Sequence, residues 1–200
     1  GTGKTAAFML PILQRLVTGQ LGPVRALIVA PTRELAEQTH QSAVVLGKYT
    51  KIKSTPVYGG VSKNRQLKAL NRGAEIVVAC PGRLLDHVND GSIDLSRIEV
   101  LVLDEADTMC DMGFLPDIRR ILTHLPKQRQ TLFFAATMSD EIRALSNDIL
   151  VEPTTVQIGI IAPAKTVSHV LYPVTNALKK QLLLHILKHT ATGRVMIFTR

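Results

Sequence analysis

The sequence predicts an α/β protein with a doubly wound, mainly parallel sheet that is flanked by helices. Short apolar runs rich in β-branched residues alternate with longer segments whose apolar residues recur at helical spacing. Glycine, proline or polar clusters follow the runs, so the polar motifs fall at the carboxyl ends of strands. This alternation is typical of parallel strand–helix–strand units. A hydrophobic content of 46% in 200 residues is ample for the core of such a domain.

The expected elements alternate along the chain. Helices are expected at residues 4–17, from residue 31, at 62–71, 84–88, 115–125 and 140–150, with the first kinked or restarted at Pro11. Strands are expected at residues 24–30, 52–58, 75–79, 100–103, 130–135 and 154–159, and residues 109–114 should be irregular.

The domain organisation follows from these elements. Residues 1–159 should form one domain, and residues 160–166, with Pro163 and no clear period, should form a linker. Residues 167–200 predict a strand at 167–174, a helix at 177–189 and a strand at 194–199. Because these few elements cannot bury a core alone, we expect them to be the beginning of a second, truncated domain.

Residues 100–107 read Val-Leu-Val-Leu-Asp-Glu-Ala-Asp, a buried strand that ends in three carboxylates. Ligands bind beyond the carboxyl ends of such strands, so Asp104, Glu105 and Asp107 should lie in a ligand crevice and require a cation. The alternative is a strand that is capped by solvated carboxylates.

The chain begins with a loop that complements these carboxylates. Its amides and the Lys4 ammonium can cradle phosphates, and the Thr5 hydroxyl can ligate magnesium. The loop comprises Gly1, Thr2, Gly3, Lys4 and Thr5, and it contains only the end of the full pattern. The two motifs, about 100 residues apart and in the expected order, together predict a P-loop nucleotide triphosphatase.

Charge favours a polyanionic partner. The net charge is +8, and residues 38–74 contain no acidic residue. Seven cations lie in this interval: Lys48, Lys51, Lys53, Lys63, Arg65, Lys68 and Arg72. They predict either a solvated basic face or a track for a phosphate backbone. Aromatic residues make up only 4% of the chain, so contacts to the phosphate backbone, rather than base stacking, should be the main source of nucleic-acid affinity.

Other site classes find little support in the sequence. Cys80 and Cys110 form no Cys-x-x-Cys pair, so neither a disulfide framework nor a zinc site is indicated. The chain has no apolar stretch of membrane-spanning length and no signal-peptide layout, so a soluble, cytoplasmic protein is expected.

On these motifs the chain resembles the DEAD-box ATP-dependent RNA helicases, most closely the bacterial RhlE-type subgroup. Residues 1–5 resemble the end of motif I, residues 31–36 motif Ia, and Gly59-Gly60 the GG motif. Residues 80–83 resemble motif Ib, residues 104–107 motif II, residues 135–137 motif III and residues 196–200 the start of motif IV.

The resemblance implies a RecA-like first domain that binds ATP, Mg²⁺ and RNA, followed by the start of a second such domain. Lys4 would hold the β- and γ-phosphates, Thr5 and Asp104 the Mg²⁺, and Glu105 the attacking water. Sequence-independent contacts to the RNA backbone, with 2′-hydroxyls selecting RNA over DNA, would come from Pro31, Thr32, Arg33, Gly60, Cys80, Gly82 and Arg83. Asp107, Ala135 and Thr137 would couple the two sites.

The chain departs from the family pattern at two positions. Motif III usually begins with serine, and the hydrogen bond that Ala135 cannot make is worth about 0.5–1.5 kcal/mol. We therefore predict that hydrolysis survives better than unwinding. Motif Ib usually begins with threonine, and Cys80 offers only a weak donor, so RNA affinity should fall slightly.

Three functions stay open at this point. The first is RNA unwinding that is driven by ATP. The second is an ATP-gated RNA clamp with weak unwinding, which Ala135 favours, and the third is a DNA helicase. The adenine-reading segment and the arginine-bearing motifs of the second domain lie outside these residues. The chain alone should therefore be nearly inactive.

Overall fold

The computed structural model describes residues 3–157, 168, 170–190 and 193–199. The chain divides into two compact units, Gly1–Pro153 and Thr154–Arg200, and each is described by itself. None of the described helices has the length and apolar character that a membrane crossing requires.

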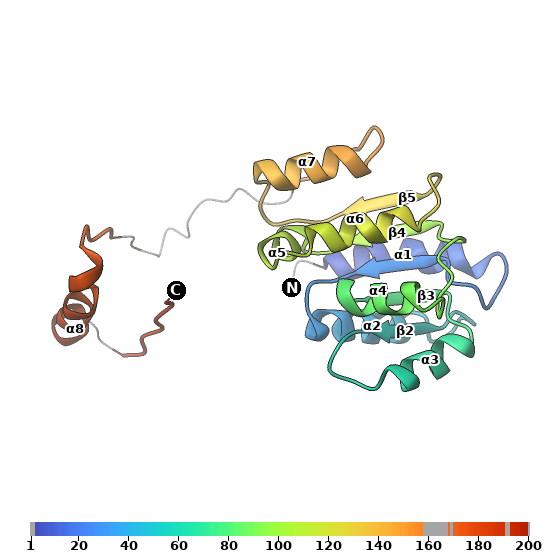
Figure 1. Ribbon diagram of the computed structural model, residues 1–200, viewed down its shortest axis with the longest axis horizontal. Coiled ribbons are helices and arrows are strands. Elements are labelled where there is room, and N and C mark those ends of the chain that lie inside the picture. The colour runs from blue at the N-terminus through green and yellow to red at the C-terminus, as the bar shows by residue number, and fades with distance from the viewer. Residues whose placement is uncertain (1–2, 158–167, 169, 191–192, 200) are drawn as a thin grey trace. The chain divides into compact units, whose positions relative to one another are not determined.

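A five-stranded parallel sheet organises the first unit (Figure 1). Its strands are β1 (Ala26–Val29), β2 (Ser54–Val57), β3 (Ile76–Ala79), β4 (Val100–Leu103) and β5 (Gln130–Phe133). They pair in the order β2-β3-β1-β4-β5. The register aligns their last residues, so all five strands end at one level. We call this side of the sheet the carboxyl edge and the opposite side the amino edge. The predicted doubly wound parallel sheet is confirmed.

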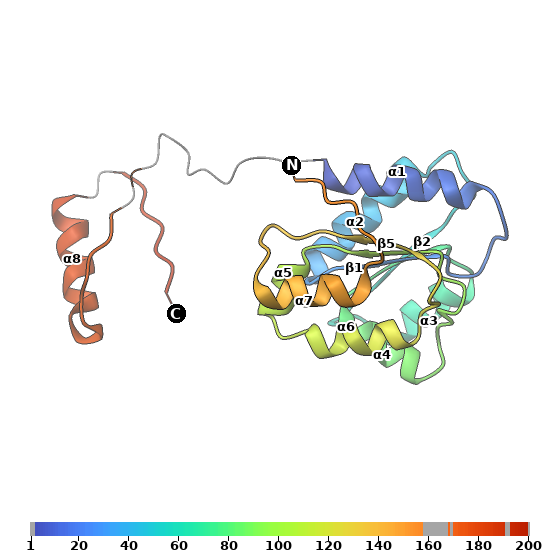
Figure 2. The same cartoon turned by 90° about the horizontal axis from the view of Figure 1, so that it is seen from above.

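Helices cover both faces of this sheet (Figure 2). Helices α1 (Lys4–Val17) and α2 (Arg33–Leu46) lie on one face. The other face is covered by α4 (Pro81–Asn89), α5 (Ala106–Asp111), α6 (Leu115–Thr123) and α7 (Asp140–Ile149). Helix α3 (Lys63–Asn71) packs beside the edge strand β2.

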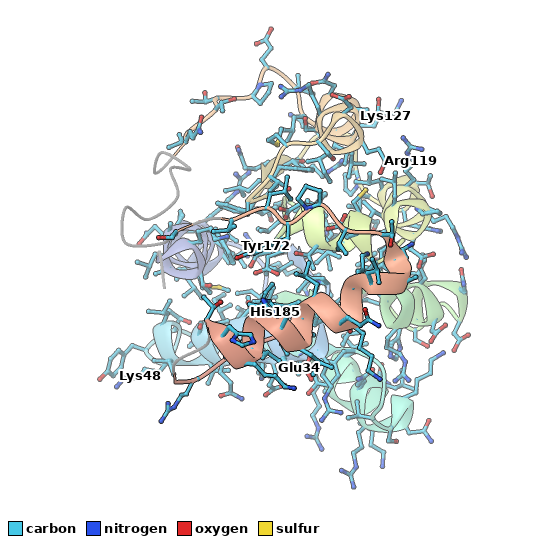
Figure 3. All side chains as sticks on the ribbon, turned by 90° about the vertical axis from the view of Figure 1, so that its left-hand side faces the viewer. Glu34, Lys48, Arg119, Lys127, Tyr172 and His185 are labelled. Atoms are coloured by element: carbon cyan, nitrogen blue, oxygen red, sulfur yellow. The ribbon has the colours of Figure 1, made fainter. Side chains whose placement is uncertain are left out.

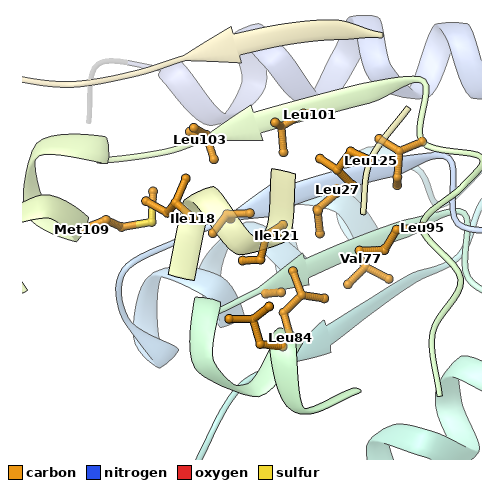
Figure 4. Packing of buried hydrophobic residues seen from close by; sticks show 14 of the residues in the cluster. Leu27, Val77, Leu84, Leu95, Leu101, Leu103, Met109, Ile118, Ile121 and Leu125 are labelled. Atoms are coloured by element: carbon orange, nitrogen blue, oxygen red, sulfur yellow. The ribbon is translucent and has the colours of Figure 1, made fainter. Parts of the chain in front are cut away.

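Two hydrophobic clusters explain why the central strands are apolar throughout. In β1, Leu27 and Val29 face the cluster beneath α4 and α6, whereas Ala26 and Ile28 face the cluster beneath α1 and α2. Successive strand residues point to opposite faces, so a strand covered on both sides needs an unbroken apolar run. Figure 4 shows Leu27, Val77 and Leu101 packed against Leu84 and Ile121 on the first of these faces.

The structure corrects three local predictions in the first unit. Helix α1 runs without interruption through Pro11, which is exposed, so water can replace the backbone bond that proline cannot donate. Residues 109–111 are helical rather than irregular, because Ala106 and Met109 share the buried face of α5. Strand β5 ends at Phe133, two residues earlier than expected.

The second unit contains a 3₁₀ turn, η1 (Asn176–Leu178), and helix α8 (Lys179–His189), so the helix predicted at 177–189 is confirmed. The predicted strands at 154–159, 167–174 and 194–199 were wrong for the residues that the structure describes. Ile197 and Phe198 are 49% and 88% exposed, and a strand needs a neighbour for its backbone bonds. The predicted linker at 160–166 lies outside the described residues, and the predicted domain limits stay predictions.

Candidate functional site

The predicted site residues gather at the carboxyl edge of the sheet. Residues 31–33 follow β1, Gly59 and Gly60 follow β2, and residues 80–83 follow β3. Residues 104–107 follow β4 and residues 135–137 follow β5. In strand order, the RNA-contact candidates occupy the β2-β3-β1 half of the edge. The nucleotide candidates occupy the β4-β5 half.

The end of the phosphate loop opens α1. Gly3 is the N-cap of this helix at φ 75°, a left-handed conformation that favours glycine. Lys4 and Thr5 occupy the first helical turn, where unpaired N–H groups and the helix dipole favour an anion. Gly1 and Thr2 lie outside the described residues.

Asp104 is the buried carboxylate of the site. It follows β4 directly and is only 3% exposed, and its Oδ1 atom is buried without a hydrogen-bond partner in the described structure. Burial raises the pKa of Asp104, and the positive charge of Lys4 opposes this shift in part. Lys4 therefore lies close enough to act on Asp104. A buried carboxylate oxygen without a partner suits Mg²⁺, and the hydroxyl of Thr5, which follows Lys4 in the first turn of α1, is an oxygen ligand of the kind that Mg²⁺ prefers.

Glu105 adopts a strained backbone conformation. It is the N-cap of α5 at φ 51° and ψ 52°, a left-handed conformation that is uncommon for residues other than glycine. The Thr108 hydroxyl donates to Glu105 Oε2 at 3.5 Å. Strained positions of this kind cluster at functional sites, because the surrounding structure must hold them there.

Asp107 joins motif II to motif III. Its Oδ2 atom accepts from the Ala136 amide at 3.1 Å and from the Thr137 amide and hydroxyl at 2.8 and 3.0 Å. Burial alone would raise the pKa of Asp107, but the hydrogen bonds that its carboxylate accepts, those from Thr137 foremost, together outweigh burial, so the pKa is lowered. The neighbouring Ala106 amide donates to the Phe134 carbonyl at 2.9 Å. Ala135 packs partly buried against the core and has no hydroxyl to add.

Arg33 and Gly60 meet at the other half of the edge. The Arg33 guanidinium lies 5.4 Å from the centroid of the Tyr58 ring, and a β-carbon on Gly60 would lie 3.4 Å from Arg33 Nη1. The Tyr58 hydroxyl donates to Glu37 Oε2 at 2.7 Å. The amide of Gln41 and the hydroxyl of Tyr58 hold the pKa of Glu37 below its ordinary value. The ring of Tyr58 thus holds the Arg33 guanidinium beside the exposed Gly60.

Arg83 is engaged within the protein. Its Nη1 donates to the Val61 carbonyl at 3.0 Å and to Gln66 Oε1 at 3.4 Å, and its Nε lies 3.4 Å from Asp86 Oδ2. Gln66 also donates to the Tyr58 carbonyl at 2.8 Å and contacts the buried His87 at 3.2 Å. These bonds tie the glycine loop after β2 to the start of α4.

The remaining candidates supply helix ends. The Thr32 hydroxyl accepts from the Leu35 amide at 3.2 Å and so caps α2, with Pro31 just ahead of it. Cys80 is the N-cap of α4, and burial raises the pKa of its thiol to about 11. Gly82, in the first turn of α4, is exposed, and a β-carbon there would meet open space.

Sequence reasoning missed four residues of this network: Tyr58, Glu37, Gln66 and His87. The position of Tyr58, directly before the glycine pair, was a usable signal, because an aromatic at a strand end can stack on an arginine. Gln66 and His87 carry no such signal. Their contacts depend on how α3 and α4 pack.

A hollow of about 270 Å³ lies at the amino edge and is lined by residues that include Gly19, Arg25, Ser96 and Glu99. The Arg25 guanidinium there already donates to the Leu16 and Thr18 carbonyls and pairs with Glu99 at 2.6 Å. With its donors used internally, this hollow is not the candidate site.

Known proteins are similar to this chain in sequence. A model of the DEAD/DEAH box helicase family matches residues 1–145. The chain is 45% identical over 158 residues to the DEAD-box ATP-dependent RNA helicase CshA of Geobacillus kaustophilus. The aligned residues cover 79% of this chain and 34% of that relative. The chain is also 44% identical over 206 residues to the ATP-dependent RNA helicase DDX42 of Xenopus laevis, covering 99% of this chain and 22% of the relative. The chain thus spans about a third or less of these curated relatives.

Two solved structures resemble the fold. A DEAD box protein from Methanococcus jannaschii superposes with a TM-score of 0.70 at 38% identity, over 76% of this chain and 41% of that one. A hypothetical ATP-dependent RNA helicase from Sulfolobus tokodaii superposes with a TM-score of 0.69 at 42% identity, over 76% of this chain and 44% of that one. The predicted RecA-like fold of the first unit is confirmed, and the chain belongs to the DEAD/DEAH box helicase family.

Proposed function

We propose that the full-length protein is an ATP-dependent RNA helicase that couples RNA-stimulated ATP hydrolysis to local separation of RNA duplexes. One observation carries the proposal. The buried Asp104, under the charge of Lys4, and the Arg33–Gly60 pair lie at the same edge of a single sheet. A triphosphate and a nucleic-acid backbone can therefore bind side by side.

In the nucleotide half, the amides at the start of α1 and the Lys4 ammonium would bind the β- and γ-phosphates. Asp104 and the Thr5 hydroxyl would hold Mg²⁺, which neutralises the charge that develops on the phosphate oxygens. Glu105 would orient a water molecule whose oxygen attacks the γ-phosphorus and would accept its proton as the bond to ADP breaks.

In the RNA half, Arg33 would pair with a backbone phosphate, and the exposed glycines Gly60 and Gly82 would allow the strand to approach closely. Contacts to phosphates carry no sequence information, so binding would be independent of base sequence. The 2′-hydroxyls would select RNA over DNA. The cytoplasm, which supplies both ATP and RNA, is the proposed location.

Coupling between the halves would run through Asp107 and motif III, where Asp107 accepts from two backbone amides and from the hydroxyl of Thr137. The missing hydroxyl at Ala135 favours a second candidate function, an RNA clamp that hydrolyses ATP but separates strands poorly.

The experiment is ATP hydrolysis by the full-length protein, with and without single-stranded RNA or DNA, beside release of a short labelled RNA duplex. The helicase proposal predicts stimulation by RNA rather than DNA, together with ATP-dependent strand release. RNA stimulation without strand release would favour the clamp. Stimulation by DNA alone would favour a DNA helicase.

A further inference from the structure

The basic residues of the interval 38–74 do not extend the RNA-contact half of the carboxyl edge. Lys48, which is labelled in Figure 3, and Lys51 lie in the loop after α2, and Lys53 directly precedes the first residue of β2. They therefore lie at the amino edge, opposite Arg33 and Gly60. The Lys53 ammonium donates to the carbonyl of Arg72, just past α3, at 3.3 Å, which joins the loop to that helix.

We call this region the basic edge surface and define it as Lys48, Tyr49, Lys51, Lys53, Lys68 and Arg72, all of which are exposed. Within the described part of the chain, none of its cations pairs with a carboxylate. Lys63 of the same interval differs, because it pairs with Asp90. Uncompensated charges of one sign repel each other, and a bound polyanion relieves this repulsion.

Tyr49 narrows the choice of polyanion. Its side chain is 89% exposed, and the Lys48 ammonium lies 4.6 Å from the ring centroid, over one of the two ring faces. An exposed aromatic ring among cations offers a stacking platform for a base beside donors for phosphates. An acidic protein segment would use the charges but would gain little from the ring.

We propose that the basic edge surface binds a second segment of the single-stranded RNA, outside the site at the carboxyl edge. The proposal rests on the proposed function, in that it takes RNA as the substrate. The surface lies wholly within the first unit and far along the strands from Lys4 and Asp104. Its contribution to RNA binding is therefore independent of nucleotide. Its effect is to retain a long strand between cycles of hydrolysis.

The test compares RNA binding by the full-length protein and its variants, measured by fluorescence anisotropy without nucleotide across a range of salt concentrations. The probes are oligouridylates of about 30 and about 6 nucleotides, since one stacking and phosphate-binding site covers about 4–16 nucleotides. The variants are Lys48→Gln/Lys51→Gln and Tyr49→Ala. The matched control is Arg97→Gln/Lys127→Gln, which removes two exposed cations that also precede strands.

For the longer RNA, we expect the double lysine variant to reduce the slope of log K against log salt concentration by about 1.4, since each phosphate contact contributes about 0.7. Tyr49→Ala should weaken binding about fivefold or more. The control variant should bind as the parent does, and both test variants should bind the short RNA normally when an ATP analogue is present.

Two outcomes would overturn the assignment. One is a double lysine variant that binds the longer RNA as the parent does at every salt concentration. The other combines two results: Tyr49→Ala leaves the affinity for the longer RNA unchanged, and polyglutamate competes for the surface as effectively as RNA does. These results would assign the surface to an acidic protein. If the parent binds neither probe with or without the analogue, the proposed function fails as well. If the parent binds the short probe and the double lysine variant leaves binding of the longer probe unchanged, only the assignment of the basic edge surface fails.

Discussion

The two halves of the carboxyl edge differ in how completely their polar groups are satisfied. In the β4-β5 half, Asp104 keeps a buried oxygen without a partner and Glu105 holds a left-handed backbone. In the β2-β3-β1 half, Arg33 rests on Tyr58, and the donors of Arg83 reach Val61 and Gln66. The nucleotide half thus carries an energetic cost that a ligand can offset. The RNA half is organised in advance by its own side chains.

The largest effect is expected from Glu105→Gln, which sharpens the comparison within the nucleotide half. Glutamine keeps the shape of the side chain but cannot accept the proton of the attacking water. Loss of a general base typically costs about 10²–10⁴-fold in rate. RNA-stimulated hydrolysis by the full-length protein should fall by such a factor, whereas ATP-dependent RNA affinity should persist. A variant that hydrolyses ATP within about threefold of the parent rate would remove Glu105 from the role of base.

Asp104→Asn tests whether the nucleotide half is destabilised when it is empty. Burial raises the pKa of Asp104 and the charge of Lys4 opposes the shift in part, so folding disfavours the ionised form relative to the unfolded chain. A raised carboxyl pKa means that the ionised group destabilises the fold at pH values above the folded pKa. This destabilisation vanishes as the pH falls below the pKa that Asp104 has in the unfolded chain.

We therefore expect Asp104→Asn to raise the ligand-free melting temperature at neutral pH, by about 2–4 °C for each kcal/mol recovered. The gain should shrink as the pH falls toward the ordinary range for aspartate. Stabilisation by Mg²⁺ and ATP should disappear in the same variant. Differential scanning fluorimetry over a pH series measures both effects. An equal or lower melting temperature at neutral pH would show that the carboxylate is adequately solvated.

The link between the halves is tested by Ala135→Ser. A serine hydroxyl at this position would add a hydrogen bond beside those that Asp107 already accepts from Ala136 and Thr137. One such bond is worth about 0.5–1.5 kcal/mol, or roughly a 2- to 12-fold effect. Strands released per ATP hydrolysed should rise within that range while the rate of hydrolysis changes little. An unchanged ratio would mean that the Asp107 contacts alone transmit the coupling.

The same comparison shows how far the sequence could predict the site. The strand ends were predictable, because apolar runs that stop at polar residues mark the carboxyl edge and place Asp104, Arg33 and Gly60 on it. The contacts that join Gln66 to Arg83 and His87 were not predictable. They depend on β3 lying between β2 and β1, and local periodicity does not encode strand order. The apolar run at residues 194–199 predicted a strand for the same reason, since a local pattern does not reveal whether a neighbour is present.

The smallest effect is expected at Tyr58, where two substitutions separate its two contacts. Tyr58→Phe keeps the ring under Arg33 and removes the hydroxyl that donates to Glu37, whereas Tyr58→Leu removes both contacts. A cation–π contact at an exposed site is worth about 0.5–1 kcal/mol, or roughly 2- to 5-fold in affinity. The RNA concentration for half-maximal ATPase stimulation should therefore rise by that factor for Tyr58→Leu and less for Tyr58→Phe. The KM for ATP should stay constant in both variants, because Tyr58 lies in the other half of the edge. If both substitutions weaken RNA stimulation equally, the hydroxyl bond to Glu37, rather than the ring, holds Arg33 in place.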